Sequence, residues 1–348
     1  MKSAEVMSIS SKSSILIILM GSLGDVARGL GLVSHIKAQR PESRITWLVE
    51  PKCADLVGLH PQIDHVIEFK RKRSVAAMWD LYQELQTEHF DITLDLQRHL
   101  KSGFFSRLSR AKRRIGFHRR NAKELNWLFN NESIPYCDEN LPKLSHYLKF
   151  TEHLGLPEPN RLDFGLKSLD VNKLVPPAVV AIQNSFIAVV MGSSWESKNW
   201  NFEGYGNLVQ HIIKNQNRPV VLLGGGDQWT VAQKHIEKAN SPKIINLTGN
   251  SLIEMTAVLK AAAAAVGPDS GPGHLAAAVG TPYVTLFGPT PASRHVPYGC
   301  EHLTVQSDLD CVPCYQKQCP ENNKRCMQNI DIGDVAQKIS RALKDTAN

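Results

Sequence analysis

Side chains that could bind a phosphate group stand in the loop "MGSSWESKNW", which follows an apolar run in the second half of this 348-residue sequence. Ser193 and Ser194 supply two hydroxyls where the apolar run ends, and Lys198 supplies a mobile cation close by. Two hydroxyls and an ammonium suit a phosphate group. A plain serine-rich turn would explain the hydroxyls, but it gives no reason for Lys198.

A second loop, "GPDSGPGHLAAAVG", predicts an anion site where a strand ends and a helix begins near Gly273. Free amides at a helix N-terminus, together with Ser270 and Gly271, bind anions readily. His274 could donate to a phosphate oxygen, or it is a core histidine on an alanine-rich face. The charge of Asp269 does not suit phosphate, so we expect it to fix the loop or a sugar hydroxyl. This loop and the serine loop together indicate a pyrophosphate.

A third loop, "MGSLGDVARGL", follows the first apolar run and opens the first expected helix. Gly21 and Gly24 let a ligand approach the backbone closely, and Asp25 stands at the helix start. The loop is not a full G-x-G-x-x-G, so it is weak as a dinucleotide fingerprint. Asp25 is then either a functional carboxylate or merely the helix N-cap.

Elements that would position these loops alternate between strand and helix along most of the chain. Short, nearly continuous apolar strands such as "ILIILMG", "FIAVVMG" and "TPYVTLFG" favour parallel sheets that are covered on both faces. Ser251 and Glu254 form a capping box for a helix that ends near Lys260. We predict an α/β protein of two Rossmann-like doubly wound domains, residues 1–170 and 171–348, joined through the proline-bearing stretch 157–177.

The net charge of +7 is concentrated in one segment, residues 96–123, which has ten Lys and Arg and no Asp or Glu. Such a single-sign run repels itself, so we expect it to face an anionic partner, although a solvated helix face is the alternative. The longest apolar run near the start is far short of the roughly 20 residues that span a bilayer, and no signal-peptide cleavage site follows it. Seven cysteines without a secretory signal favour a reducing compartment, so we expect a cytoplasmic protein.

The motifs "GSLGDV", "LDLQRHLKSG", "GSSWESKNW" and "GPDSGPGHLAAAVGTPYVTLFGPT" resemble, in order and spacing, those of glycosyltransferase family 9, the ADP-heptose:lipopolysaccharide heptosyltransferases. The resemblance implies the GT-B architecture, in which two Rossmann-like domains face each other across a cleft. The N-terminal domain would bind the acceptor. The C-terminal domain, with its Cys-rich tail and final helix, would bind the nucleotide-sugar.

Carried over by position, the resemblance also implies roles for single residues. Asp25 matches the general base of an inverting transfer, and Lys198 matches a catalytic cation that neutralises the departing ADP. Donor-binding positions are Ser193, Ser194, Asp227, Gln228, Asn250, Asp269, Ser270, Gly271 and His274. Acceptor-binding positions are Ser22, Gln97, Lys101, Arg107, Arg110, Arg113 and Arg120. The basic ones would face an anionic acceptor made of lipid A and Kdo, or the cytoplasmic face of the inner membrane. The protein would be peripheral to that membrane.

Two other functions remain open on these residues. Asp227, Gln228 and Asn250 differ from the family pattern near the nucleobase, so the donor could be another nucleotide-sugar on the same fold. A non-catalytic anion- or RNA-binding protein would also use the basic segment. That segment, however, lacks an RNA-binding signature, and we expect no nucleic-acid partner.

Four cysteines near the C-terminus follow a C-x2-C-x4-C-x6-C spacing: Cys311, Cys314, Cys319 and Cys326. That pattern is consistent with a structural zinc ion, although only the first pair has the usual close spacing. We expect the reaction to need no metal or other cofactor.

Overall fold

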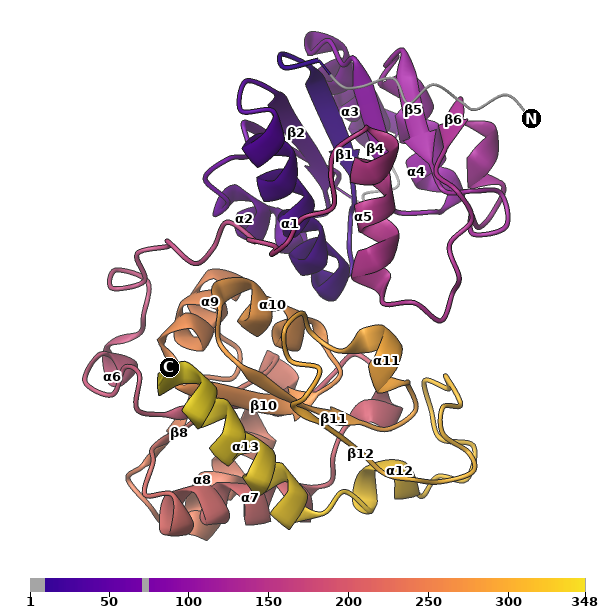
Figure 1. Ribbon diagram of the computed structural model, residues 1–348. Coiled ribbons are helices and arrows are strands. Elements are labelled where there is room, and N and C mark those ends of the chain that lie inside the picture. The colour runs from indigo at the N-terminus through magenta and orange to yellow at the C-terminus, as the bar shows by residue number, and fades with distance from the viewer. Residues whose placement is uncertain (1–9, 71–74, 348) are drawn as a thin grey trace. The chain divides into compact units, whose positions relative to one another are not determined.

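The computed structural model describes residues 10–70 and 75–347, and it divides into two compact units, Met1–Leu166 and Lys167–Asn348 (Figure 1). The division falls within the proline-bearing stretch 157–177. Each unit is built around its own six-stranded sheet, and every strand pairing in both sheets is parallel. The α/β class and the two doubly wound domains predicted from the alternating strands and helices are therefore confirmed.

The first unit has the strand order β3-β2-β1-β4-β5-β6. Its strands are β1 (Ser14–Ile18), β2 (Arg44–Val49), β3 (His65–Glu68), β4 (Ile92–Asp95), β5 (Arg113–Gly116) and β6 (Glu132–Ser133). Its helices are α1 (Leu23–Gln39), α2 (Pro51–Gly58), α3 (Val75–Thr87), α4 (Leu100–Leu108), the 3-10 turn η1 (Asn126–Leu128) and α5 (Lys143–His153).

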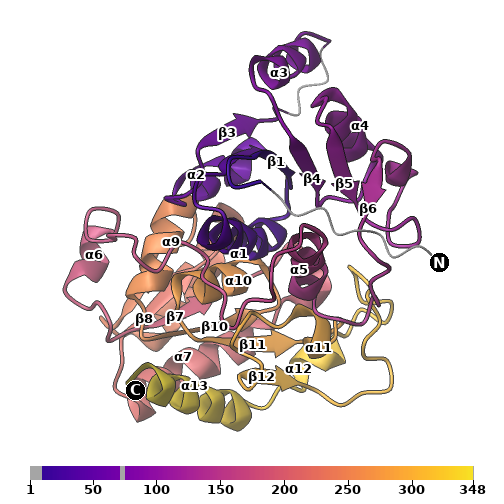
Figure 2. The same cartoon turned by 45° about the horizontal axis from the view of Figure 1, so that its top comes forward.

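Helices cover both faces of this sheet, which explains why its central strands are apolar without alternation. Figure 2 shows α3 and α4 on one face and α1 and α5 on the other. One core cluster joins Leu16 and Ile18 of β1 to Leu81 and Leu85 of α3 and to Phe105 of α4. The opposite face is closed by α1, where Val26, Leu30 and Val33 are fully buried, as a strand–helix–strand unit requires.

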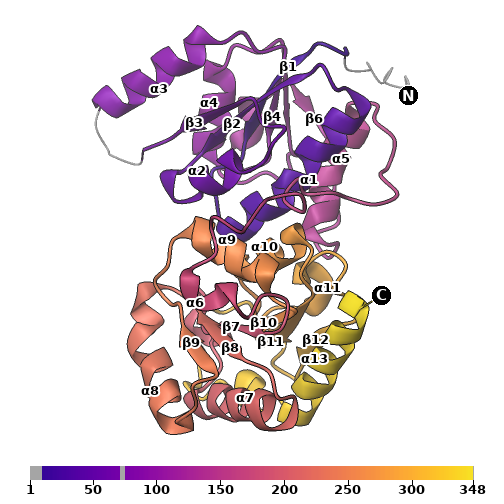
Figure 3. The same cartoon turned by 90° about the vertical axis from the view of Figure 1, so that its left-hand side faces the viewer.

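The second unit repeats the plan with the strand order β12-β11-β10-β7-β8-β9. Its strands are β7 (Ile187–Val190), β8 (Val220–Leu223), β9 (Ile244–Asn246), β10 (Ala264–Pro268), β11 (Tyr283–Phe287) and β12 (Thr304–Gln306). Its helices are α6 (Pro177–Val180), η2 (Glu196–Lys198), α7 (Phe202–Asn215), η3 (Gly226–Gln228), α8 (Trp229–Ala239), α9 (Leu252–Ala261), α10 (Gly271–Val279), α11 (Ala292–His295), α12 (Arg325–Gln328) and α13 (Ile332–Ala347). Figure 3 shows α9 and α10 on one face of this sheet and α7, α8 and α13 on the other.

Local sequence signals explain several element ends. The capping box is confirmed, because the backbone N–H of Glu254 donates to Ser251 Oγ at 3.2 Å and the N–H of Ser251 donates to Glu254 Oε2 at 2.9 Å. Helix α10 begins at Gly271, two residues earlier than predicted, with Ser270 as its N-cap. The edge strands β6 and β12 were not predicted, because two or three residues with little apolar content leave no periodic pattern.

Candidate active site

Asp25 lies in the first turn of α1, at the carboxyl end of β1, where ligands of open parallel sheets bind. Its Oδ1 accepts hydrogen bonds from Arg28 Nη1 and Lys143 Nζ, each at 3.0 Å, and its Oδ2 accepts one from the Ser22 hydroxyl at 3.0 Å. Burial alone would raise the pKa of this carboxyl, but the charges of Lys143 and Arg28 outweigh it and hold the pKa at about 2. Asp25 is therefore ionised at neutral pH.

The N-cap of α1 is Ser22, and Asp25 is the third residue of the helix. The alternative interpretation of Asp25 as the N-cap is therefore wrong. Its carboxylate does face the helix start, since the backbone N–H of Ser22 lies 3.4 Å from Oδ2. The hydroxyl of Ser22 also points at Asp25, so this serine orients the carboxylate in the structure.

Gln97 connects the two loops on either side of the point where the strand order reverses, between β1 and β4. Its Oε1 accepts the backbone N–H of Met20 at 2.8 Å and of Gly21 at 3.3 Å. The side chain therefore holds the Asp25 loop in place, and a contact of Gln97 with an acceptor stays a prediction.

The basic segment, residues 96–123, is spread over several elements of the first unit. Lys101 and Arg107 stand on α4, Arg113 on β5, and Arg110 and Arg120 in the flanking loops. Arg113 is already engaged, because its Nε and Nη2 each lie 2.8 Å from a Glu132 carboxylate oxygen, and this pairing raises the pKa of the guanidinium. Its charge is therefore balanced by Glu132, and a contact of Arg113 with an acceptor stays a prediction.

Aromatic rings contact three of the four other basic residues that were predicted to bind the acceptor. The guanidinium of Arg120 lies 4.5 Å from the centre of the Tyr136 ring, and the ammonium of Lys101 lies 5.0 Å from that of Phe69. Arg110 donates to the Tyr82 hydroxyl at 2.9 Å. Because stacking leaves one side of a guanidinium uncovered, Arg120 can still meet an anion.

In the second unit, Lys198 and Asp269 form a buried ion pair at the carboxyl ends of β7 and β10, where this sheet's strand order reverses. Lys198 Nζ lies 2.6 Å from Asp269 Oδ2, and their side chains are 11% and 5% exposed. The Thr290 hydroxyl donates to the same carboxylate oxygen at 2.7 Å. Burial would raise the pKa of Asp269, but the charges of Lys198 and His295 hold it at about 2. Asp269 thus fixes the position of Lys198.

The serine loop and the start of α10 lie on either side of this pair. Ser193 Oγ accepts the Trp195 N–H at 3.1 Å, which closes a tight turn, whereas the Ser194 hydroxyl has no protein partner among the described residues. Ser270 Oγ donates to the carbonyl of Pro268 at 3.1 Å, and Gly271 opens the helix. His274 is buried in α10, where its charge lowers the pKa of Asp269.

Predicted nucleobase-side residues follow the next two strands of the same sheet. Asp227 and Gln228 belong to η3 after β8, and Gln228 Nε2 donates to Asp227 Oδ2 at 2.8 Å. The Gln228 side chain lies over Gly192, where an added Cβ would stand 3.2 Å from it. Asn250, after β9, precedes the Ser251 cap of α9. All the predicted donor residues therefore gather at the carboxyl edge of one sheet.

The sequence reasoning missed several residues that hold these groups. Arg28 stands three positions after Asp25 on α1, a helical spacing that would have revealed it. Lys143 lies 118 positions away, and only the packing of α5 against α1 brings it to the carboxylate. Tyr147 of α5 is also close to Asp25, and burial together with that negative charge raises the pKa of its phenol.

The four C-terminal cysteines are free thiols, and Cys326 is buried while Cys311 is exposed. Burial, followed by the charges of the other three thiols, raises the pKa of Cys326. In residues 10–70 and 75–347, no three His, Cys, Asp or Glu side chains are arranged to hold a metal ion. Within the same ranges, no helix has the length and apolar character needed to cross a membrane.

Known proteins resemble this chain in sequence and in fold. Residues 78–325 match the model of glycosyltransferase family 9 (heptosyltransferase). Over 82% of both chains, the sequence is 26% identical to the lipopolysaccharide core heptosyltransferase OpsX of Haemophilus influenzae. It is also 26% identical to lipopolysaccharide heptosyltransferase 1 of Pseudomonas aeruginosa, over 88% of this chain and 87% of that one.

Solved structures agree on the fold. The E. coli heptosyltransferase WaaC with ADP matches with a TM-score of 0.78 and 21% identity, over 94% of this chain and 99% of that one. The glycosyl transferase family 9 protein of Veillonella parvula matches with a TM-score of 0.80 and 18% identity, over 96% and 97% of the two chains.

Two doubly wound parallel sheets with polar loops at their carboxyl edges define an α/β protein that binds ligands at those edges. The match of residues 78–325 to a family model then identifies the class of enzyme. This chain belongs to glycosyltransferase family 9, and it is a glycosyltransferase enzyme. The matched residues begin at 78, so the family model does not cover the loop that carries Asp25.

Proposed function

We propose that this enzyme transfers heptose from ADP-heptose to the inner core of lipopolysaccharide. The names of its curated relatives support the reaction, and WaaC has been solved with ADP and with ADP-2-deoxy-2-fluoro heptose, which supports the donor. In the second unit, the Lys198 ammonium, the Ser194 hydroxyl and the start of α10 offer donors to a pyrophosphate.

The acceptor we propose is an anionic glycolipid, a Kdo-bearing lipid A or its extension with heptose. Lys101, Arg107, Arg110 and Arg120 carry positive charge on the first unit, which also holds Asp25. Basic side chains attract anionic headgroups, by about 1 kcal/mol each near a charged surface. The enzyme would therefore work peripherally at the cytoplasmic face of the inner membrane, where such an acceptor is presented.

Asp25 would act as the general base of a direct displacement that inverts the anomeric carbon. The acceptor hydroxyl forms the new bond to that carbon while the bond to the ADP oxygen breaks, and ADP leaves with the electron pair. A carboxylate with a pKa of about 2 is too weak a base to ionise a free hydroxyl. It takes the proton only as the new bond forms, when the attacking oxygen has become strongly acidic.

Lys198 would stabilise the negative charge that develops on the departing ADP. Asp269, which is itself bonded to Thr290, holds the Lys198 ammonium in place before substrate binds. Little reorganisation of this site is therefore needed during the reaction. No metal is required in this scheme, because the cation is supplied by a side chain. The single observation that carries the mechanism is the Asp25 carboxylate, 15% exposed and paired with Arg28 and Lys143, at the switch point of the first sheet.

The function can be tested by incubating the purified full chain with ADP-heptose and Kdo-bearing lipid A, and then following the mass of the lipid. We expect the lipid to gain one heptose, and replacement of ADP-heptose by UDP- or GDP-sugars to abolish the product. A second acceptor that already carries one heptose separates addition of the first from addition of the second. Product with UDP- or GDP-sugars alone would overturn the donor assignment and favour another transferase of the same fold.

A further inference from the structure

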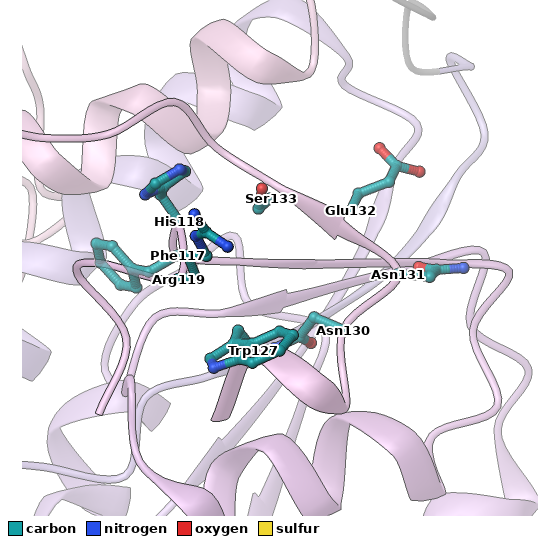
Figure 4. A pocket seen from close by; sticks show the side chains of 8 residues that line it. All are labelled: Phe117, His118, Arg119, Trp127, Asn130, Asn131, Glu132 and Ser133. Atoms are coloured by element: carbon teal, nitrogen blue, oxygen red, sulfur yellow. The ribbon is translucent and has the colours of Figure 1, made fainter. Parts of the chain in front are cut away.

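A pocket of about 260 Å³ lies at the carboxyl end of β5, beside the edge strand β6. It is lined by Phe117, His118, Arg119, Trp127, Asn130, Asn131, Glu132 and Ser133 (Figure 4). In the sheet order, β5 is separated from β1 only by β4, so the pocket opens on the same sheet edge as the Asp25 loop. Its volume is slightly below the roughly 300–1,000 Å³ of pockets for drug-sized ligands, which suits a single sugar ring.

The carboxylate and amide oxygens that line this pocket are already engaged by the protein. Both carboxylate oxygens of Glu132 lie 2.8 Å from Arg113 nitrogens, and the second also lies 3.2 Å from His153 Nε2. Asn130 Oδ1 accepts the Ser106 hydroxyl at 2.6 Å, and Asn131 Oδ1 accepts the backbone N–H of Arg114 at 2.7 Å. The one acid in the lining is therefore neutralised, and both amide oxygens already accept a hydrogen bond from the protein.

The groups that stay free in the pocket are donors. Within the described ranges, the Arg119 guanidinium, the Trp127 indole N–H and the Ser133 hydroxyl have no protein partner. His118 Nδ1 lies 3.3 Å from the backbone N–H of Arg120 and accepts from it, which leaves the ring proton on Nε2. Three nitrogen donors and a hydroxyl, one of them permanently charged, call for a ligand with a carboxylate or phosphate group.

Trp127 also offers an apolar surface. Trp127 is 41% exposed, although tryptophan side chains are usually largely buried. Figure 4 shows its ring on one side of the pocket, opposite His118 and Arg119. A sugar ring has an apolar face that can stack on an indole while its polar groups reach the donors across the pocket.

We propose that this pocket binds one acidic sugar of the acceptor, a ring that carries a carboxylate or a phosphate. That this sugar belongs to the acceptor rests on the proposed function, whereas the binding itself does not. The pocket would hold a charged unit away from the reacting hydroxyl, and such remote contacts help to position the reacting group.

The first test measures binding of three small probes to the full chain by calorimetry: galacturonate, glucose 6-phosphate and glucose. We expect at least one of the two charged sugars to bind and glucose not to bind. Arg119→Ala should weaken binding by about tenfold, the loss expected for one charge-assisted contact, and Trp127→Ala should weaken it by about tenfold through the lost stacking. Arg161→Ala is the matched control, because Arg161 is an exposed arginine of the same unit outside the pocket.

The choice of probe identifies the anionic group, since binding of galacturonate alone indicates a carboxylate and binding of glucose 6-phosphate alone indicates a phosphate. A second measurement uses the transfer reaction, where Arg119→Ala should lower kcat/KM for the acceptor about tenfold. Failure of both charged sugars to bind, or binding equal in all variants, overturns the pocket proposal. Absence of transfer in a protein that still binds the charged sugars would instead overturn the proposed function.

Discussion

Carboxylates that are little exposed and paired with cations define both candidate sites at the scale of single residues. Asp25 and Asp269 would each have a raised pKa from burial alone, yet the pKa of each is held at about 2. In each case a lysine from a distant part of the chain, Lys143 or Lys198, supplies the compensating charge. Each carboxylate needs its lysine in place, because an isolated buried charge destabilises the folded protein far more than a paired one.

Substitution of Lys143 should change the pH dependence of the transfer. In the proposed reaction the active form of Asp25 is the carboxylate. With a pKa of about 2, this group stays ionised as the pH falls. The pH profile of kcat/KM should therefore show no acid limb from Asp25 above about pH 4. Lys143→Met removes one lowering charge while burial remains, so the pKa rises and an acid limb moves up into the measurable range. Lys149→Met, on the same helix but paired with Glu152, is the control. Identical profiles for the wild type and Lys143→Met would contradict the assignment.

Lys198 should contribute to both stability and catalysis, and a double substitution separates the two. Lys198→Met leaves Asp269 buried without its partner, which should cost about 3–5 kcal/mol and lower the melting temperature. Adding Asp269→Asn removes the unpaired charge and keeps a polar group for Thr290, so thermal stability should largely return. We expect kcat to stay low in both variants. Recovery of kcat together with stability would show that Lys198 has only a structural role.

At the scale of elements, the cysteine-bearing segment 311–326 holds the short turn η2 that ends in Lys198. The Ser197 hydroxyl donates to the carbonyl of Gln316 at 2.6 Å, and the Ser197 N–H donates to the carbonyl of Lys317 at 3.1 Å. Lys324 forms an ion pair with Glu196 at 2.6 Å. Both residues that precede Lys198 are therefore tied to this segment.

Loss of the hydrogen bond from the Ser197 hydroxyl should displace Lys198 and leave the fold intact. We expect Ser197→Ala to lower kcat by about tenfold or more, since small displacements in a site have large effects on rate. Ser197→Thr should restore most of the activity, because it retains the hydroxyl. Ser340→Ala on α13, which removes a similar hydroxyl bond of 2.9 Å to the carbonyl of Ala336, controls for simple destabilisation. Equal activity of Ser197→Ala and wild type would contradict a positioning role.

The elements were largely predictable from sequence, because long apolar strands and a capping box such as Ser251–Glu254 are local signals. The loops at the strand ends were predictable for the same reason, and they include Asp25 and Lys198. Lys143 was not predictable, since its contact with Asp25 depends on how α5 packs. The pocket at β5 was missed too, because Trp127 and Arg119 meet there only through the fold.

At the scale of the whole molecule, each of the two units presents a charged pair at the switch point of its own sheet, and the proposed chemistry divides between them. In the proposed reaction, the first unit would supply a proton acceptor and the second would supply a cation for the leaving ADP. Because Lys198 provides that cation, we expect the transfer rate to be unchanged after treatment with EDTA. A rate that falls with EDTA and returns with added Mg²⁺ or Mn²⁺ would show that a metal ion takes part.

The most direct measurement is the release of ADP from ADP-heptose with and without Kdo-bearing lipid A, compared between the wild type, Asp25→Asn and Asp64→Asn. Asp64 is also paired with a lysine, Lys37. Its carboxylate, however, accepts the backbone N–H of Ile45 in β2, at the amino ends of the strands and away from Asp25. We predict release that depends on the acceptor, survives in Asp64→Asn and falls by a hundredfold or more in Asp25→Asn, roughly the contribution of a general base. Acceptor-dependent release that persists in Asp25→Asn would contradict the central claim.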